Sequence, residues 1–219
     1  MHRYNGDAFE RVIYSESHDE VSNGKARVPE DIWPGNAGSW FSRKRSTLAA
    51  ALVFTAPGIP MIFQGQEFLE DGWFQDGKML DWNKELKYGG VLNVYRDLIH
   101  LRRNWFDNTR GLRSQFINVF HVNNRDKLIA FHRWGDGGPR DDVIVIANFA
   151  NRAYDRYQIG LPGGGVWRVR FNSDWAGYSA DFGNHPSYDV TAYAGSKDNL
   201  DYNGCVSIGQ YTAVILSQD

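Results

Sequence analysis

The spacing of apolar residues changes from about 3.6 to 2 near Trp105, and this change constrains the fold more than any other feature of the chain. Before Trp105, apolar segments of strand length alternate with helical patterns. After it, short alternating segments are separated by clusters of Gly, Asn, Asp and Pro, as expected for strands joined by turns. The 219 residues are therefore predicted to form a helix-containing half followed by an all-β half.

Two strand-helix units are predicted in the first half, with strands at 11–15 and 60–63 and helices at 43–55 and 91–105. Ser42 is the expected N-cap of the first of these helices, and Pro57-Gly58 ends it. This alternation, with near-continuous apolar strands, is typical of a parallel sheet covered on both faces. Because two units cannot close a parallel barrel, the first half is expected to be part of something larger.

Six strands are predicted in the second half, at 116–122, 127–134, 142–150, 157–161, 166–171 and 211–217. Their period of two and the turn signals between them predict an antiparallel sandwich. The segment 174–203 is polar, aromatic and rich in Gly, and its periodicity is too weak to assign.

Charge and cysteine content exclude several function classes. The formal charge of −2 leaves no basic excess for a nucleic acid or an anionic membrane surface. The single Cys205 cannot form an internal disulfide or a thiolate zinc cluster, and no metal or cofactor site is predicted. Pro and Gly interrupt the most apolar segment, 47–63, so no membrane-spanning helix is expected.

The first ten residues lack the apolar core of a signal peptide and run almost directly into the first predicted strand. We therefore expect either a cytoplasmic protein whose chain starts here or a Met1 that is not the natural start.

The first candidate site is the segment 15–25 (SESHDEVSNGK), which follows the first predicted strand. Catalytic groups of parallel α/β folds sit at the carboxyl ends of strands, where Glu16, His18, Asp19 and Glu20 would lie. The alternative is that these residues are turn formers or solvated charges.

The second candidate site is the segment 64–75 (QGQEFLEDGWFQ), directly after the second predicted strand. Carboxylates and amides beside aromatic rings suit sugars, because hydroxyl groups take paired hydrogen bonds while the apolar ring face stacks. A structural alternative is that Trp73 and Phe74 cap the rim of the barrel and that Glu67 accepts from buried backbone N–H groups. Trp134, Trp167 and Trp175 could stack a sugar on the all-β half, although core packing is their commoner use.

The two motifs together carry a family resemblance. VIYSESHDEVSNGK and APGIPMIFQGQEF, followed by a helix and a β domain, resemble the C-terminal part of the α-amylase superfamily, glycoside hydrolase family 13, whose members include 1,4-α-glucan branching enzymes and bacterial α-amylases. The resemblance implies that residues 1–108 are the last two strand-helix units of a (β/α)₈ TIM barrel. Residues 109–219 would be the C-terminal all-β domain.

The resemblance also implies roles for individual residues toward an α-1,4-glucan such as starch, glycogen or a maltooligosaccharide. His18 and Asp19 would hydrogen-bond the 2- and 3-hydroxyls of the sugar whose bond is broken, and Asp19 would stabilise the transition state as the third catalytic carboxylate. Substrate-binding residues would be His18, Glu20, Gln66, Glu67 and Trp73, of which Gln66 and Glu67 match the motif after the eighth barrel strand.

Retaining hydrolysis needs two further carboxylates, a nucleophile and an acid/base, which the family carries after strands four and five. Those segments would precede Met1, so the chain alone is expected to be catalytically incomplete. An N-terminal part of the barrel would complete it, in cis or in trans. The alternatives are an α-glucan-binding module without catalysis or an inactive truncated product. An open barrel face would expose strand edges and favour oligomerisation.

Overall fold

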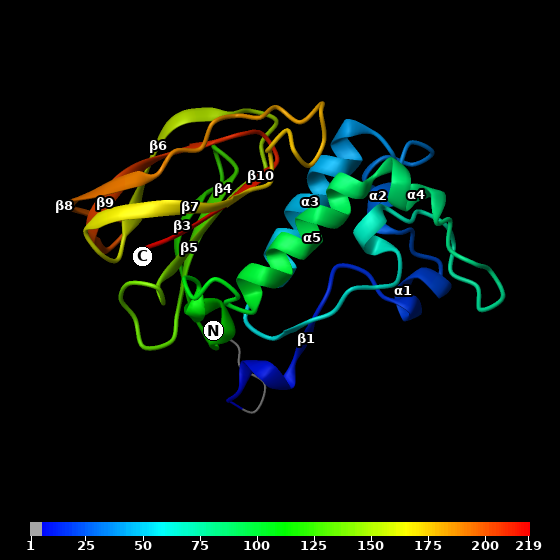
Figure 1. Ribbon diagram of the computed structural model, residues 1–219, viewed down its shortest axis with the longest axis horizontal. Coiled ribbons are helices and arrows are strands. Elements are labelled where there is room, and N and C mark those ends of the chain that lie inside the picture. Colours follow the sequence, from blue (N-terminus) through cyan, green and yellow to red (C-terminus); the bar gives the residue numbers. More distant parts are fainter. Residues whose placement is uncertain (1–5) are drawn as a thin grey trace.

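A computed structural model describes residues 6–219, arranged as a helical layer packed against an antiparallel β-sandwich (Figure 1). The expectation about the start of the chain rests partly on residues 1–5, which lie outside this range. None of the helices in the described range is long and apolar enough to cross a membrane.

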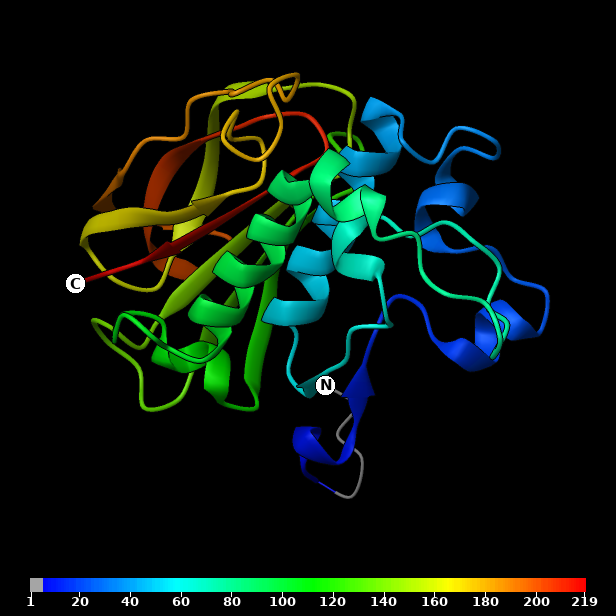
Figure 2. The same cartoon turned by 45° about the vertical axis from the view of Figure 1, so that its right-hand side comes forward.

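The helical layer holds two long helices and two short parallel strands. The strands are β1 (Val12–Ile13) and β2 (Ile59–Pro60), and the helices are α1 (His18–Ser22), α2 (Val28–Ile32), α3 (Trp40–Thr55), α4 (Asn83–Lys87) and α5 (Gly89–Arg102). Single 3₁₀ turns cover Ala8–Glu10, Gln66–Phe68 and Arg110–Arg113. Figure 2 shows α3 and α5 side by side along the sandwich, with β1 beyond them.

The predicted order of strand, helix, strand, helix is present, but three details differ. The N-cap of α3 is Ser39, which accepts from the Ser42 N–H at 3.1 Å, while Ser42 itself is buried inside the helix. The strands are shorter than predicted, with only two residues each. They are also not covered on both faces within the described range, because Val12 and Ile59 are about half exposed.

The sandwich is one eight-stranded antiparallel sheet that curls upon itself. In the order β3-β4-β5-β10-β7-β8-β9-β6, its strands are β3 (Phe116–Asn123), β4 (Leu128–Trp134), β5 (Val143–Asn148), β10 (Thr212–Ser217), β7 (Gly165–Asn172), β8 (Val190–Lys197), β9 (Leu200–Ile208) and β6 (Tyr154–Leu161). Its two edges meet where Asn123 of β3 donates to the Tyr157 hydroxyl of β6 at 2.7 Å. The predicted antiparallel sandwich is confirmed. Two strands are added to those predicted: β8, which lies in the unassigned segment 174–203, and β9, which begins in that segment and ends at Ile208.

Strands β5 and β10 are buried on both faces, and this determines how the layers stack. Alternate side chains of a strand point to opposite faces. Val143 and Val145 therefore join the core formed with α3 and α5, whereas Ile144 and Ile146 join the core inside the sandwich. The helical layer and the sandwich thus share one apolar interface.

The buried carboxyl end of α3 is satisfied by two arginines. Arg102 of α5 donates to the carbonyls of Ala56, at 2.7 Å, and Gly58. Arg133 of β4 donates to the carbonyls of Thr55 and, at 3.2 Å, Leu112. Arg102 is therefore buried and not solvated, because the last carbonyls of a buried helix need donors from elsewhere.

Candidate functional site at the carboxyl ends of β1 and β2

Both candidate motifs lie at the same edge of the β1–β2 pair. The two strands are parallel, with Val12 opposite Ile59 and Ile13 opposite Pro60, so their carboxyl ends point the same way. The segments 15–25 and 64–75 leave the strands at that edge. The structure therefore brings together the two segments that the sequence singled out.

Gln66 connects these two strand ends. Its side-chain amide donates to the Ser15 hydroxyl after β1 and accepts from the Phe63 N–H after β2 at 3.2 Å. Gly65 makes this arrangement possible, because its φ is +81° and a Cβ there would lie 2.8 Å from the Cβ of Glu70. Gln66 is buried, and its amide contacts the Ser15 side chain and the Phe63 backbone, which indicates a positioning role.

A buried ion pair forms the floor of the site. Glu16 accepts from Arg27 at 3.2 Å and from the Val28 N–H at 2.7 Å, and both charged side chains are almost completely buried. Arg27 also donates to the Gln64 carbonyl at 2.8 Å, and its guanidinium lies 4.1 Å from the ring centroid of Phe63. Burial raises the pKa of the Glu16 carboxyl. This pair fixes the first motif, α2 and the second motif against one another.

Sequence reasoning overlooked Arg27. Nothing in its local sequence distinguishes it from a surface arginine, and only the tertiary contact with Glu16, 11 positions away, marks it as part of the site.

His18 and Asp19 begin the short helix α1 and are exposed. Ser17 caps this helix by accepting from the Glu20 N–H at 3.4 Å. The Nε2 of His18 lies 3.1 Å from Asp19 Oδ1, with side-chain exposures of 63% and 78%. The His18 ring also meets Phe74 edge-on at 6.3 Å, which brings the second motif beside this pair. Both polar groups are accessible to a ligand.

The remaining acidic groups have different surroundings. Glu20 accepts from Lys25 at 2.8 Å. A cavity of about 560 Å³ beside it is lined by Glu16, Glu20, Asp31 and neighbouring residues of the first motif, and neither His18 nor Asp19 lines this cavity. Within residues 6–219, no three His, Cys, Asp or Glu side chains are placed to hold a metal ion.

Glu67 has a buried oxygen without a partner. Its Oε2 makes no hydrogen bond to any residue of the described range, and the same holds for the hydroxyl of Tyr95. Burial raises the pKa of Tyr95, and the nearby carboxylates Glu16 and Glu67 add to that shift. The structural alternative is that Glu67 accepts hydrogen bonds from buried backbone N–H groups. No backbone N–H of the described residues donates to this oxygen, so the alternative is not supported there.

The loop that carries Trp73 is organised by Glu70. Its carboxylate accepts from the N–H groups of Gly72 and Asp81, at 2.8 and 2.9 Å, and from Lys84 at 2.9 Å. Despite burial, these donors lower the pKa of Glu70 to about 2. Trp73 itself is 46% exposed at the mouth of the site, so its ring is available for stacking.

Comparison with known proteins assigns the sandwich. Residues 119–219 match the family model described as the alpha amylase C-terminal all-beta domain. The predicted resemblance of the chain to the C-terminal part of the α-amylase superfamily is confirmed.

Similarity to relatives extends beyond residues 119–219. A 1,4-alpha-glucan branching enzyme GlgB of Rhodopseudomonas palustris (strain BisB5) is 33% identical over 181 residues, covering 77% of this chain and 24% of the relative. The branching enzyme GlgB of Bradyrhizobium sp. is 31% identical over 179 residues, with the same shares. The chain thus spans about a quarter of the length of these curated relatives.

Solved structures share the fold over nearly the whole chain. A pullulanase from Anoxybacillus sp. LM18-11, complexed with maltotetraose, aligns with a TM-score of 0.64 and 20% identity over 97% of this chain and 28% of its own. An alpha-amylase from H. orenii aligns with a TM-score of 0.60 and 19% identity over 95% of this chain and 40% of its own. At these identities the likeness concerns the fold alone.

Proposed function

We propose that this chain supplies the third catalytic carboxylate, Asp19, and part of the sugar-binding site of a retaining enzyme that acts on α-1,4-glucans, either a branching enzyme or a hydrolase. The curated relatives named as glucan branching enzymes support this substrate class. Residues 1–108 would then be the last two strand-helix units of the catalytic (β/α)₈ barrel, and residues 109–219 its C-terminal domain.

One observation carries the proposal: Asp19, directly after β1, is an exposed carboxylate that pairs with no cationic side chain of the fold other than its neighbour His18. Glu16 holds Arg27, Glu20 holds Lys25 and Glu70 holds Lys84. Among the described residues, the only side chain in polar contact with the carboxylate of Asp19 is its neighbour His18. An exposed carboxylate and imidazole side by side can make paired hydrogen bonds to adjacent sugar hydroxyls.

In this mechanism Asp19 is neither the nucleophile nor the proton donor. It would accept hydrogen bonds from the 2- and 3-hydroxyls, together with His18, and these bonds would strengthen as the sugar ring flattens toward the oxocarbenium-like transition state. Gln66 and the Glu16–Arg27 pair would keep the strand ends in register, while Trp73, Glu67 and Glu20 would contribute to the walls of the sugar site. The nucleophile and the acid/base would come from other strands of the barrel.

Those other strands would also cover the open side of the β1–β2 pair. Val12, Tyr14 and Ile59 are each 43–50% exposed there, an unusual number of large apolar side chains for so short a sheet. These strands would lie at this face whether they belong to the same polypeptide or to a partner chain.

The test is turnover by an enzyme assembled from this chain and a segment that supplies the nucleophile and the acid/base. Asp19→Asn keeps the size of the side chain and removes its charge, and kcat is expected to fall about a thousandfold, the equivalent of about 4 kcal/mol of lost transition-state stabilisation. The matched control is Asp76→Asn, at an exposed carboxylate on the neighbouring loop, and it should leave kcat unchanged. Equal kcat values for Asp19→Asn and the unaltered enzyme would refute the proposed role.

A further inference from the structure

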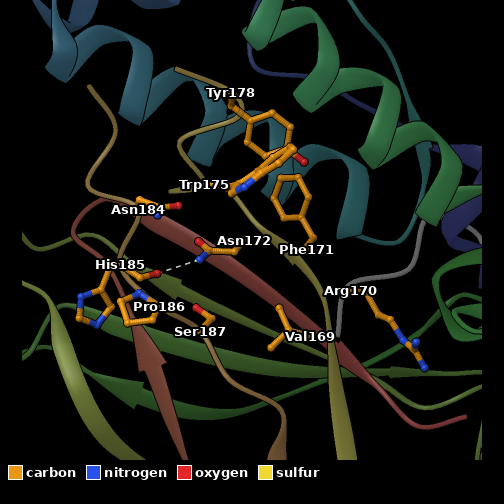
Figure 3. Close-up of a pocket in the computed structure, with 10 residues that line it drawn as sticks. All are labelled: Val169, Arg170, Phe171, Asn172, Trp175, Tyr178, Asn184, His185, Pro186 and Ser187. Carbon is orange, nitrogen blue, oxygen red and sulfur yellow. Dashed lines mark hydrogen bonds between the residues drawn. The ribbon is translucent and has the colours of Figure 1, made fainter. Parts of the chain in front are cut away.

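A second cavity lies far along the chain from the strand-end site, on the sandwich. It has a volume of about 460 Å³ and is lined by the end of β7 and the loop that follows, including Asn172, Trp175, Asn184 and His185 (Figure 3). We propose that this cavity, called here the Trp175 pocket, is a second, non-catalytic binding site for α-glucan. The choice of α-glucan rests on the proposed function.

Trp175 provides an exposed and fixed aromatic surface. Trp175 is 54% exposed, while Asp174, Tyr178 and Phe182 of the same loop, 173–187, are buried. Tyr178 meets Trp175 edge-on, with ring centroids 5.1 Å apart and planes at 87°. Gly177 lies directly against the ring, since a Cβ at that position would be 2.4 Å from an indole carbon. An indole held in this way loses little conformational freedom when a ligand stacks on it.

The loop that carries Trp175 is anchored to both long helices. Asp174 accepts from Lys44 of α3 and from the N–H groups of Gly183 and His185 at 3.0 and 2.9 Å. Tyr178 donates through its hydroxyl to Asp97 of α5. The Trp175 pocket is therefore formed before any ligand arrives, which is typical of sites that bind small ligands.

Two other residues that line the Trp175 pocket have polar atoms available for a ligand. Asn184 uses its Oδ1 to accept from the Ala176 N–H at 3.1 Å, and its Nδ2 makes no hydrogen bond to the described residues. His185 uses Nε2 toward the Ser207 hydroxyl at 2.9 Å, which leaves Nδ1 available within the same range. Hydroxyl groups of a sugar both donate and accept, so an amide and an imidazole beside an aromatic plane match a pyranose ring.

Polar and aromatic lining together favour a sugar over an apolar ligand or an anion. The basic side chain that lines the Trp175 pocket, Arg170, is paired with the carboxylate of Asp219, so little net positive charge is available for an anion. A site away from the reacting bond would hold the polymer near the enzyme and raise its local concentration.

The experiment measures glycogen retardation in native affinity electrophoresis and maltoheptaose binding by calorimetry, using the full chain. Trp175→Ala is expected to weaken both by about tenfold or more, as for loss of an aromatic anchor. Trp175→Phe, which keeps an aromatic face, should retain most of the binding. The matched control is Trp105→Ala, at a tryptophan that is 61% exposed on the α5 side, and it should bind normally. Thermal unfolding establishes that the variants are folded.

Glucan binding tests the Trp175 pocket, and turnover tests the proposed catalytic role, so the two can fail separately. Asp19→Ala should leave this binding largely intact while it abolishes turnover in the assembled enzyme. Normal binding by Trp175→Ala, absence of glucan binding by the unaltered chain, or complete loss of binding in Asp19→Ala would each overturn the Trp175 pocket as a second site. Normal turnover by Asp19→Ala with Trp175-dependent binding would instead refute only the catalytic role.

Discussion

Replacing Lys44 by methionine is expected to lower the free energy of unfolding by about 3 kcal/mol, at the lower end of the range for a broken buried ion pair. Lys44 of α3 and Asp174 of the loop 173–187 are both completely buried and form an ion pair. Lys44 also donates to the Thr212 hydroxyl at 3.0 Å. Methionine keeps the length of the side chain but leaves the Asp174 carboxylate buried without its counter-charge.

The magnitude follows from what remains around Asp174. Its carboxylate retains the N–H donors of Gly183 and His185, which offset part of the cost of burying a charge. Complete loss of partners would cost more, so we expect the effect at about 3 rather than 5 kcal/mol. Against a total of about 5 to 15 kcal/mol for a typical protein, this is a large fraction.

The assay is urea unfolding at 25 °C, followed by circular dichroism and tryptophan fluorescence. The matched control is Lys25→Met, because the Lys25–Glu20 pair is exposed and should contribute little in water. Adding Asp174→Asn to Lys44→Met should recover part of the loss, because the uncompensated charge is then gone. A change below about 1 kcal/mol for Lys44→Met would refute the reasoning, since the carboxylate would then be adequately stabilised without the lysine.

Two further predictions concern other buried polar side chains. Glu70 has a pKa of about 2 in the folded chain against an ordinary 4.5, so its contribution to stability is complete above pH 4.5 and is lost as the pH falls toward 2. Glu70→Gln should therefore flatten the acid side of the stability profile measured by urea unfolding, and an unchanged slope between pH 2 and 4.5 would contradict this. Arg102→Met should cost about 2 to 4 kcal/mol, because the carbonyls of Ala56 and Gly58 lose their donor. Arg96→Met, at an exposed position of the same helix, is the control for thermal unfolding.

Much of the architecture could be predicted from the sequence because local periodicity records which side of a segment is buried. The change of period near Trp105 separates α5 from the strands that follow, and strands such as β5 and β10 are continuous apolar runs. Strand β8 could not be found in this way. It has few apolar side chains, its residues from Tyr193 to Ser196 are exposed, and its pairing with β7 and β9 defines it as a strand.

The candidate site was located by sequence but not resolved into roles. The order of strands and motifs places 15–25 and 64–75 at strand ends, and the structure brings them together. Whether a carboxylate forms a structural ion pair depends on partners that are distant in sequence. Glu16 and Arg27 are 11 residues apart, and Glu70 and Lys84 are 14 apart.

The sequence by itself therefore determined the two kinds of structure and the strands with regular apolar alternation. It also determined which two segments form the candidate site. Only the tertiary structure decided that Lys44, Arg102 and Arg133 are buried, and that Asp19 stays exposed while its acidic neighbours are paired. The physical reason is that an apolar side chain is buried according to its own chemistry, whereas a charge is buried only where the folded chain supplies a partner.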